Sequence, residues 1–210
     1  MFITLEGPDG AGKSLQAATL AERLRASGRP VVLTREPGGT AIGERLREVL
    51  LGVSAPQRDP LTEAMLFSTA RHQLVVEVIE PALADGAIVV CDRYVDSTTA
   101  YQGHGGGAPL EQLAALAAVA TGGLLPDRTV LLDVPVEIGL ARRRVGEATG
   151  ITRFEVGDDY DRAYHERVRR AYLDMARADA GRWRVVDAAA DAARVADQVW
   201  SAVVDLLAEG

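Results

Sequence analysis

The chain has 210 residues, 48% of them hydrophobic and 25% charged, which suits one well-buried domain spanning residues 1–210. Its formal net charge of −7 argues against broad binding to nucleic acid, and no apolar run approaches the roughly 18–20 residues of a membrane span. The opening segment lacks the basic region of a signal peptide, and the single cysteine, Cys91, excludes an internal disulfide and a cysteine-based zinc cluster, so we expect a cytoplasmic protein without membrane contact.

The first predicted elements are a strand, a glycine-rich loop and a helix. Phe2–Glu6 predicts a short buried strand, and Leu15–Ala26 predicts a helix that ends at Gly28. Between them, residues 7–14 read GPDGAGKS and match the phosphate-binding pattern G-x-x-x-x-G-K-[ST]. The chain has 22 arginines but only one lysine, Lys13, so the place of that lysine inside the pattern is a specific signal.

Each part of this phosphate loop has a chemical role. Glycines let successive backbone N–H groups converge on phosphate oxygens, and the N-terminus of the following helix favours negative charge. Lys13 would bridge the β- and γ-phosphates of a nucleoside triphosphate, and the Ser14 hydroxyl would ligate Mg²⁺. The chain contains no asparagine, which excludes the Asn-Lys-x-Asp motif by which typical regulatory GTPases read guanine.

Further strand-like runs alternate with helices along the rest of the chain. The runs are nearly all apolar, as is typical of parallel strands covered on both faces, and the alternation indicates an α/β fold with a five-stranded parallel sheet flanked by helices on both faces. We expect Pro81 to end the helix before it. The predicted strands are Val31–Thr34, Ala87–Asp92, Thr129–Val134 and Trp183–Val186, and the predicted helices are Ala41–Leu51, Leu61–Glu80, Leu110–Thr121, Val136–Arg144, Asp159–Ala178 and Asp191–Ala208.

An acidic residue ends each of two predicted strands. Ligands of open parallel sheets bind at the carboxyl ends of the strands, so Asp92 and Asp133 are both candidates to hold Mg²⁺ opposite Ser14. In the usual strand order of P-loop kinases the third strand lies beside the first, which favours Asp92. We expect Asp133 to order the turn before Pro135 instead.

Four arginines lie near strand ends or on the helices that frame the predicted cleft: Arg35, Arg47, Arg71 and Arg93. The planar fork of arginine suits bidentate binding of phosphate. The cluster therefore indicates that the substrate which accepts the phosphoryl group from the nucleoside triphosphate itself carries a phosphate. Two unit charges about 5 Å apart repel by about 3 kcal/mol at an effective dielectric of about 20. Arginines together with Mg²⁺ would offset that repulsion.

A polar segment at about residues 142–158 predicts a mobile lid. It begins with Arg142, Arg143 and Arg144, continues through two glycines and contains Arg153. Arginines on a mobile loop could close over the transferring phosphoryl group and exclude water. Since the phosphate loop itself carries no arginine, the lid is the natural source of a guanidinium.

The sequence resembles the thymidylate kinase family, of the bacterial kind, over about residues 2–204. The resemblance rests on the phosphate loop with Glu6 before it, TREPGGT at 34–40, MLF at 65–67 with Arg71, DRY at 92–94 and YQG at 101–103. It implies a P-loop kinase that phosphorylates dTMP to dTDP with ATP and Mg²⁺. It also implies a homodimer formed through helices that include the one at 61–80.

The resemblance further implies roles on the acceptor side. Phe67 would stack on thymine, Arg71 would hydrogen-bond a base carbonyl, and Pro37 would shape the loop beneath the base. The other implied dTMP contacts are Thr98 and Gln102 at the base, Asp9 at the sugar 3′-hydroxyl, Tyr101 against the 2′ position, and Arg93 with Arg47 at the phosphate.

On the donor side, the resemblance implies an ATP site in the phosphate loop and the lid, with Arg153 the lid arginine best placed to reach the phosphates. The implied ATP contacts are Gly7, Gly10, Ala11, Gly12, Lys13, Ser14, Leu15 and Arg142. The implied catalytic residues are Lys13, Asp92, Arg93 and Arg153, and the metal site is Ser14 with Asp92.

Two positions depart from the pattern of the family. Leu15 stands where the family often has threonine or serine, so backbone N–H must replace a side-chain contact to the donor α-phosphate. Residues 103–107 read GHGGG where the family often carries an arginine, which argues against an acceptor-side or gating role for this glycine loop.

Other interpretations stay open at this point. From the residues alone, Phe67 and Tyr101 could be core side chains. A deoxynucleoside kinase with a hydroxyl acceptor would need a carboxylate base, which Asp92 could supply. A non-catalytic nucleotide-binding regulatory module would not need the arginines between 142 and 153.

Overall fold

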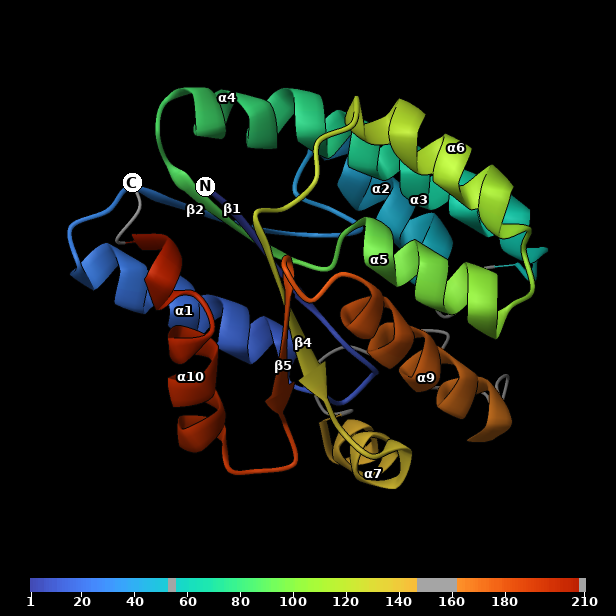
Figure 1. Cartoon of the computed structure of the whole chain (residues 1–210). Coiled ribbons are helices and arrows are strands. Elements are labelled where there is room, and N and C mark those ends of the chain that lie inside the picture. The colour runs from blue at the N-terminus through green and yellow to red at the C-terminus, as the bar shows by residue number, and fades with distance from the viewer. Residues whose placement is uncertain (53–55, 147–161, 208–210) are drawn as a thin grey trace.

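A computed structural model of the chain describes residues 1–52, 56–146 and 162–207. Five strands in these residues form one fully parallel sheet in the order β2-β3-β1-β4-β5 (Figure 1). The strands are β1 (Phe2–Glu6), β2 (Val31–Arg35), β3 (Ile88–Asp92), β4 (Arg128–Asp133) and β5 (Trp183–Asp187). The predicted α/β class and its parallel sheet are confirmed, and each predicted strand lies within one residue of its observed bounds.

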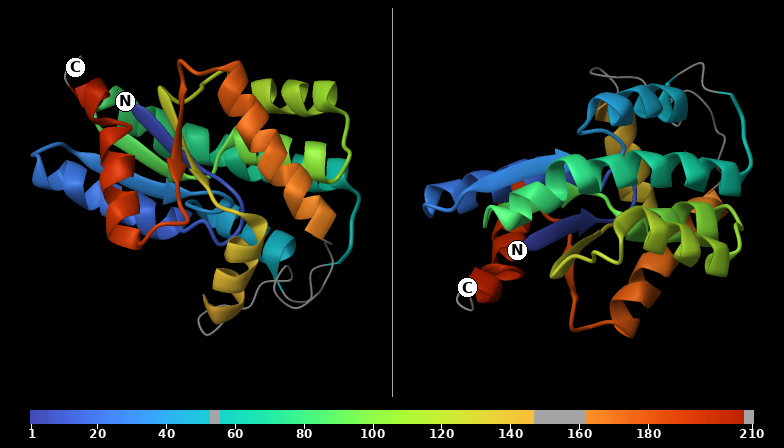
Figure 2. Two further views of the ribbon diagram at one scale, coloured as in Figure 1. Left: turned by 60° about the horizontal axis from the view of Figure 1, so that its bottom comes forward. Right: turned by 90° about the horizontal axis from the view of Figure 1, so that it is seen from above.

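Helices cover both faces of the sheet (Figures 1 and 2). On one face α1 (Lys13–Ala26) packs on β1, β2 and β3, and α10 (Ala192–Ser201) packs on α1 and β5. On the other face α4 (Glu80–Ala84) packs on β3, and α9 (Arg162–Ala178) packs on β4 and β5. The remaining elements are α2 (Ala41–Leu51), α3 (Pro60–Leu74), the π-helical segment η1 (Val75–Ile79), α5 (Val95–Thr98), the π-helical segment η2 (Thr99–Gly105), α6 (Leu110–Thr121), α7 (Val136–Gly146) and a 3₁₀ turn, Val204–Leu207.

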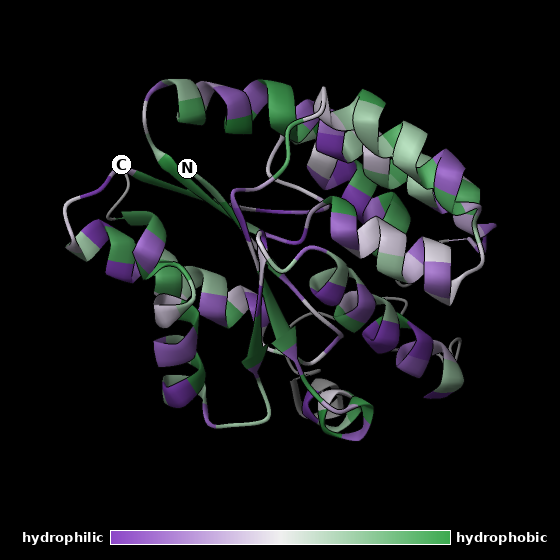
Figure 3. Cartoon of the chain, viewed as in Figure 1, coloured by the Kyte–Doolittle hydropathy of each residue, from purple (hydrophilic) through white to green (hydrophobic). Residues whose placement is uncertain are grey.

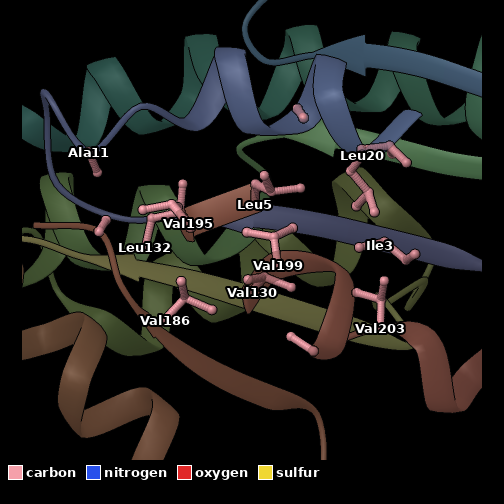
Figure 4. Close-up of a cluster of buried hydrophobic side chains, with 14 of the residues drawn as sticks. Ile3, Leu5, Ala11, Leu20, Val130, Leu132, Val186, Val195, Val199 and Val203 are labelled. Atoms are coloured by element: carbon pink, nitrogen blue, oxygen red, sulfur yellow. The ribbon is translucent and has the colours of Figure 1, made fainter. Parts of the chain in front are cut away.

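The two helical layers explain why the central strands are apolar on both faces. Successive side chains of a strand point to opposite faces, so Ile3 and Leu5 join the core beneath α1 and α10, where they pack with Leu20 and Val199 (Figure 4). Phe2 points the other way into a second core. In Figure 3 the central strands are predominantly hydrophobic while the outer helices carry mixed faces. No helix within the described ranges is long and apolar enough to cross a membrane.

The break predicted at Pro81 is wrong. The helix that starts at Pro60 continues through the π-helical segment Val75–Ile79 into α4 without leaving helical conformation. The wider π turn lets the Glu80 N–H bond to the Val75 carbonyl, and Pro81 falls in the first turn of α4. Proline is tolerated there because the π turn has already interrupted the i→i−4 hydrogen bonds that an interior proline would break.

The segment between β3 and α6 also differs from expectation, because residues 95–105 are helical. The glycines expected to form a loop partly belong to the π-helical segment η2. A Cβ on Gly105 would lie 2.7 Å from the Tyr164 ring, so glycine lets α9 pack closely here. Glycine and threonine have weak helix propensity, and tertiary packing overrides it.

The last two predicted helices have different bounds from those expected. The C-terminal helix ends at Ser201 and gives way to the 3₁₀ turn. The preceding helix, α9, is observed from Arg162, and residues 159–161 lie outside the described part of the chain.

Candidate active site

Two cavities adjoin the phosphate loop, at the carboxyl ends of the strands. The first, which we name the acceptor cavity after the role that the sequence predicts for it, has a volume of about 390 Å³, and its lining includes Lys13, Asp92, Phe67 and Gln102. The second, which we name the donor cavity on the same basis, has a volume of about 540 Å³ and lies between Gly12 and the turn at 188–192. Since Gly10, Gly12 and Leu15 line both, the loop separates two sites that share a wall.

The geometry of the loop requires glycine, as Gly10 and Gly12 show. Gly12 caps α1 with a φ of 86°, in the left-handed region. Gly10 has a φ of 75°, and a Cβ there would lie 2.0 Å from the carbonyl oxygen of Gly139. The loop is therefore packed directly against α7, which begins at Val136.

Lys13 lies at the centre of the site and is buried. Its Nζ donates to the carbonyl oxygens of Gly7 and Pro8, at 3.0 and 2.9 Å. Burial, assisted by the positive charge of Arg93, lowers the pKa of Lys13 to about 8. A phosphate brought to this ammonium would stabilise its charged form.

Ser14 and Asp92 form a pair of oxygen groups beside Lys13. Parallel pairing of β1 with β3 aligns Leu5 with Asp92, and the Ser14 hydroxyl donates to Asp92 Oδ2 at 2.5 Å. The buried Asp92 Oδ1 accepts no hydrogen bond from the described residues. A hydroxyl and an under-used carboxylate are hard oxygen ligands of the kind Mg²⁺ prefers, so these residues fit the predicted metal.

Asp133 takes a different role from the one expected. Both of its carboxylate oxygens accept from the Arg169 guanidinium of α9, at 2.7 and 2.9 Å. The expectation that this side chain orders the turn before Pro135 is therefore wrong. The ion pair fixes α9 to the end of β4.

Arg93 follows β3 directly and bridges the two halves of the site. It has a φ of 72°, which is uncommon outside glycine, and its backbone is held by a bond from its N–H to the Leu5 carbonyl. Its guanidinium donates to Asp9 Oδ1 of the phosphate loop at 2.6 Å and lies 5.0 Å from the centre of the Tyr101 ring. A cation is thus held between the loop and the acceptor cavity.

Glu6 is a carboxylate beside the site that sequence reasoning left without a role. It is fully buried and accepts from the Tyr94 N–H at 2.7 Å, the Ser97 hydroxyl at 2.6 Å and the Tyr172 hydroxyl at 2.8 Å. Burial, with the nearby charge of Asp96, raises the pKa of Glu6 to about 7. These bonds fix the turn that carries Arg93. An acid at the end of a short buried strand was the available signal.

Arg71 lies at the far end of the acceptor cavity and is almost completely buried. Its Nε donates to Glu36 Oε2 at 2.9 Å, and its Nη2 donates to the Tyr94 carbonyl and the Thr98 hydroxyl, both at 3.1 Å. Burial raises the pKa of Glu36, and the Arg71 charge opposes that rise. The buried Arg71 Nη1 has no partner among the described residues, which leaves a donor for a ligand.

Three residues reach the cavity from one helical face. Thr98, Tyr101 and Gln102 are spaced i, i+3 and i+4, so they share a face. The Tyr101 hydroxyl donates to Asp9 at 3.0 Å. Phe67 is half-buried and belongs to none of the buried apolar clusters of the described residues, so it is not a core side chain.

The remaining predicted acceptor residues are also found in this cavity. Pro37 and Arg47 line it, and Arg47 Nη1 donates to the Pro37 carbonyl at 2.9 Å. Arg35 lines it as well, but its guanidinium pairs with Glu44 at 2.9 Å.

The donor cavity is bounded on one side by Arg142. Its guanidinium donates to the carbonyls of Ala188, Ala189 and Ala190, at 2.6, 3.0 and 3.3 Å. Sequence reasoning missed Gln16 and the turn at 188–192 in this cavity's lining, because neither belongs to a recognised motif. Arg153 and most of the predicted lid, 142–158, lie outside the described residues, as do the side chains of Arg143 and Arg144.

The strand order, the lysine-bearing phosphate loop and the arginine-lined second cavity define a P-loop kinase. The thymidylate kinase family model matches residues 5–199. The chain is 54% identical to a thymidylate kinase of Thermomicrobium roseum over 209 residues, covering 100% of this chain and 97% of the relative. It is 50% identical to one of Pseudomonas fluorescens strain Pf0-1 over 208 residues, covering 99% and 96%.

A solved structure agrees with the sequence relatives. The crystal structure of thymidylate kinase from Ehrlichia chaffeensis superposes with a TM-score of 0.75 at 32% identity, covering 99% of this chain and 98% of that one. This chain belongs to the thymidylate kinase family.

Proposed function

We propose that the acceptor cavity binds dTMP, that the donor cavity binds ATP, and that the phosphoryl group passes between them beside Lys13. The reaction is the ATP-dependent phosphorylation of dTMP to dTDP, as expected of the family to which the chain belongs. The observation that carries the assignment is the ion pair between Arg93 and Asp9. This ion pair holds Arg93, a proposed dTMP contact, against the phosphate loop, where ATP would bind.

The acceptor roles follow from what each side chain has left to offer. Arg71 Nη1 is a buried donor with no partner among the residues that the structure describes, which suits it to a thymine carbonyl, and the half-buried Phe67 offers a ring for stacking. Arg93 and Arg47 would hold the dTMP phosphate. The remaining proposed dTMP contacts are Asp9, Pro37, Thr98, Tyr101 and Gln102, all of which line the acceptor cavity.

The donor roles depend on the loop. Its backbone N–H groups and the start of α1 would bind ATP phosphates, with contacts at Gly7, Gly10, Ala11, Gly12, Ser14, Leu15 and Arg142. Lys13 would leave its carbonyl partners for the β- and γ-phosphates. Ser14 and Asp92 would hold Mg²⁺, which would neutralise phosphate charge when bound. Arg153 stays a prediction for the lid.

Transfer needs little proton chemistry on this chain. An oxygen of the dTMP phosphate attacks the γ-phosphorus of ATP, the bond from that phosphorus to the β–γ bridging oxygen breaks, and ADP leaves. The nucleophile is already anionic near neutral pH, so no general base is required. Arg93 and Lys13 offset repulsion between the two nucleotides and the charge that develops between them.

The alternatives are less well supported. A hydroxyl acceptor would need a carboxylate base, yet Asp9 is paired with Arg93, and we assign the oxygen of Asp92 that has no partner among the described residues to Mg²⁺. A non-catalytic module has no need of the acceptor cavity with its arginines. Membership of a family of kinases favours catalysis over both.

A coupled ADP-release assay with ATP and Mg²⁺ tests the proposal across a panel of acceptors. We expect turnover with dTMP and little with thymidine. Preference for thymidine would support the hydroxyl-acceptor alternative. Tight ATP binding without dTDP formation would support the regulatory module.

We further propose a homodimer, formed through helices that include the segment at 61–80. Met65 and Val76, within that segment, expose 48% and 51% of their surface in the single chain, and Val119 on the adjacent α6 exposes 79%, so apolar side chains are available there for an interface between copies. Light scattering coupled to gel filtration would give twice the chain mass. A monomer would contradict the proposal. A cytoplasmic location stays a prediction.

A further inference from the structure

Glu63 is a buried carboxylate beside the acceptor cavity that takes no part in the proposed phosphoryl transfer. Glu63, in the first turn of α3, is 5% exposed. Its Oε2 accepts from Gln102 Nε2 at 2.9 Å, in a bond that is itself buried. Gln102 lines the cavity and is proposed to contact dTMP. Glu63 is therefore hydrogen-bonded to a residue that would contact the substrate.

The charge of Glu63 is held in place by Arg58. Arg58 Nε lies 3.5 Å from Glu63 Oε1, and both side chains are nearly inaccessible to solvent. The same guanidinium donates to the carbonyls of Val49 and Leu50 at the end of α2, at 2.9 and 2.7 Å. Arg58 therefore holds Glu63 in position, and the end of α2 holds Arg58.

This arrangement determines which way the Gln102 amide points. An ionised carboxylate only accepts hydrogen bonds, so the amide must turn Nε2 toward Glu63. Gln102 Oε1 accepts no hydrogen bond from the described part of the chain, and it is the atom left for a ligand. Reversing the amide would set its oxygen against the carboxylate in a buried place, which is costly.

We propose that Glu63, supported by Arg58, is a specificity-determining positioning residue, which locks the Gln102 amide so that it presents an acceptor to the pyrimidine base. This inference rests on the proposed dTMP site. Thymine and uracil carry a donor at N3, whereas cytosine carries an acceptor there. The locked amide therefore accepts from N3–H of the first two and repels N3 of the third.

The test is a comparison of three acceptors in wild type and Glu63→Gln. The variant keeps the shape of the side chain, but its amide can donate as well as accept, so Gln102 can turn either way. We expect kcat/KM for dTMP relative to dCMP to fall by about tenfold, as one hydrogen bond is worth. The ratio of dTMP to dUMP should stay unchanged, because both bases carry N3–H.

Controls separate this role from a structural one. Glu22→Gln removes an exposed carboxylate from α1 and should leave all three rates unchanged. A loosened site would lower all three acceptors together, and the KM for ATP would serve as a check on the donor side. If wild type phosphorylates dTMP but Glu63→Gln keeps the dTMP-to-dCMP ratio, this inference fails alone. If wild type does not phosphorylate dTMP, the proposed function fails first.

Discussion

The phosphate loop and the acceptor cavity adjoin each other but are built in different ways. The phosphate loop is one contiguous stretch, residues 7–14, whose backbone N–H groups and single lysine are available to bind phosphate. The acceptor cavity is assembled from side chains of several elements, and its main polar residues, Arg71, Arg93 and Gln102, are each held by a carboxylate elsewhere in the chain. Changes in the loop should therefore affect transfer, and changes in the cavity should affect the binding of dTMP.

Lys13→Ala should show the largest effect and should separate catalysis from folding. We expect kcat to fall by about 10²–10³-fold, the typical cost of one preorganised charge-stabilising group. The melting temperature should not fall, since burial already disfavours the lysine charge. Steady-state kinetics and thermal melting would measure both. Near-normal turnover would remove Lys13 from the mechanism.

Arg93→Ala should raise the KM for dTMP by about 10–100-fold, the value of a charge-assisted hydrogen bond. The KM for ATP should change little, since the arginine faces the acceptor. Arg177→Ala, which removes an exposed arginine from α9, is the matched control. An effect confined to ATP would reverse the assignment of the two cavities.

Phe67→Ala should weaken dTMP binding by about tenfold, because stacking on a base is worth roughly 1–3 kcal/mol. Stability should change little, since Phe67 is outside the buried clusters of the described residues. Calorimetric titration with dTMP would measure the affinity. Unchanged affinity together with a lower melting temperature would return Phe67 to the core.

The smallest effect concerns pH on the donor side. The pKa of Lys13 is about 8 in the free protein, and bound phosphates would raise it, so ATP binding takes up a proton above that pH. Affinity for ATP should therefore fall as pH rises, by about threefold between about pH 7.5 and 8.5. Binding titrations of wild type and Lys13→Arg, whose charge does not titrate there, would measure the slope. Equal slopes would exclude Lys13 as its source.

The same contrast explains what the sequence could predict. The loop, the sheet and most helices follow from local patterns, and the residues for which the resemblance implies contact with dTMP line one cavity. Glu6 and Glu63 were missed as partners because their bonds join residues far apart, 166 positions for Glu6 with Tyr172 and 39 for Glu63 with Gln102. The helix at 95–105 was missed because packing against α9, rather than propensity, stabilises it.

The pairing of β1 with β3 has a consequence for how the two nucleotides are spaced. Leu5 is aligned with Asp92, so the loop after Glu6 and the turn at Arg93 begin at the same level of the sheet. A shift of one residue would displace Arg93 by about 3.3 Å and turn every side chain of the strand to the opposite face. The backbone hydrogen bonds between β1 and β3 thus fix the distance between the phosphate loop and Arg93, and with it the distance over which the phosphoryl group is transferred.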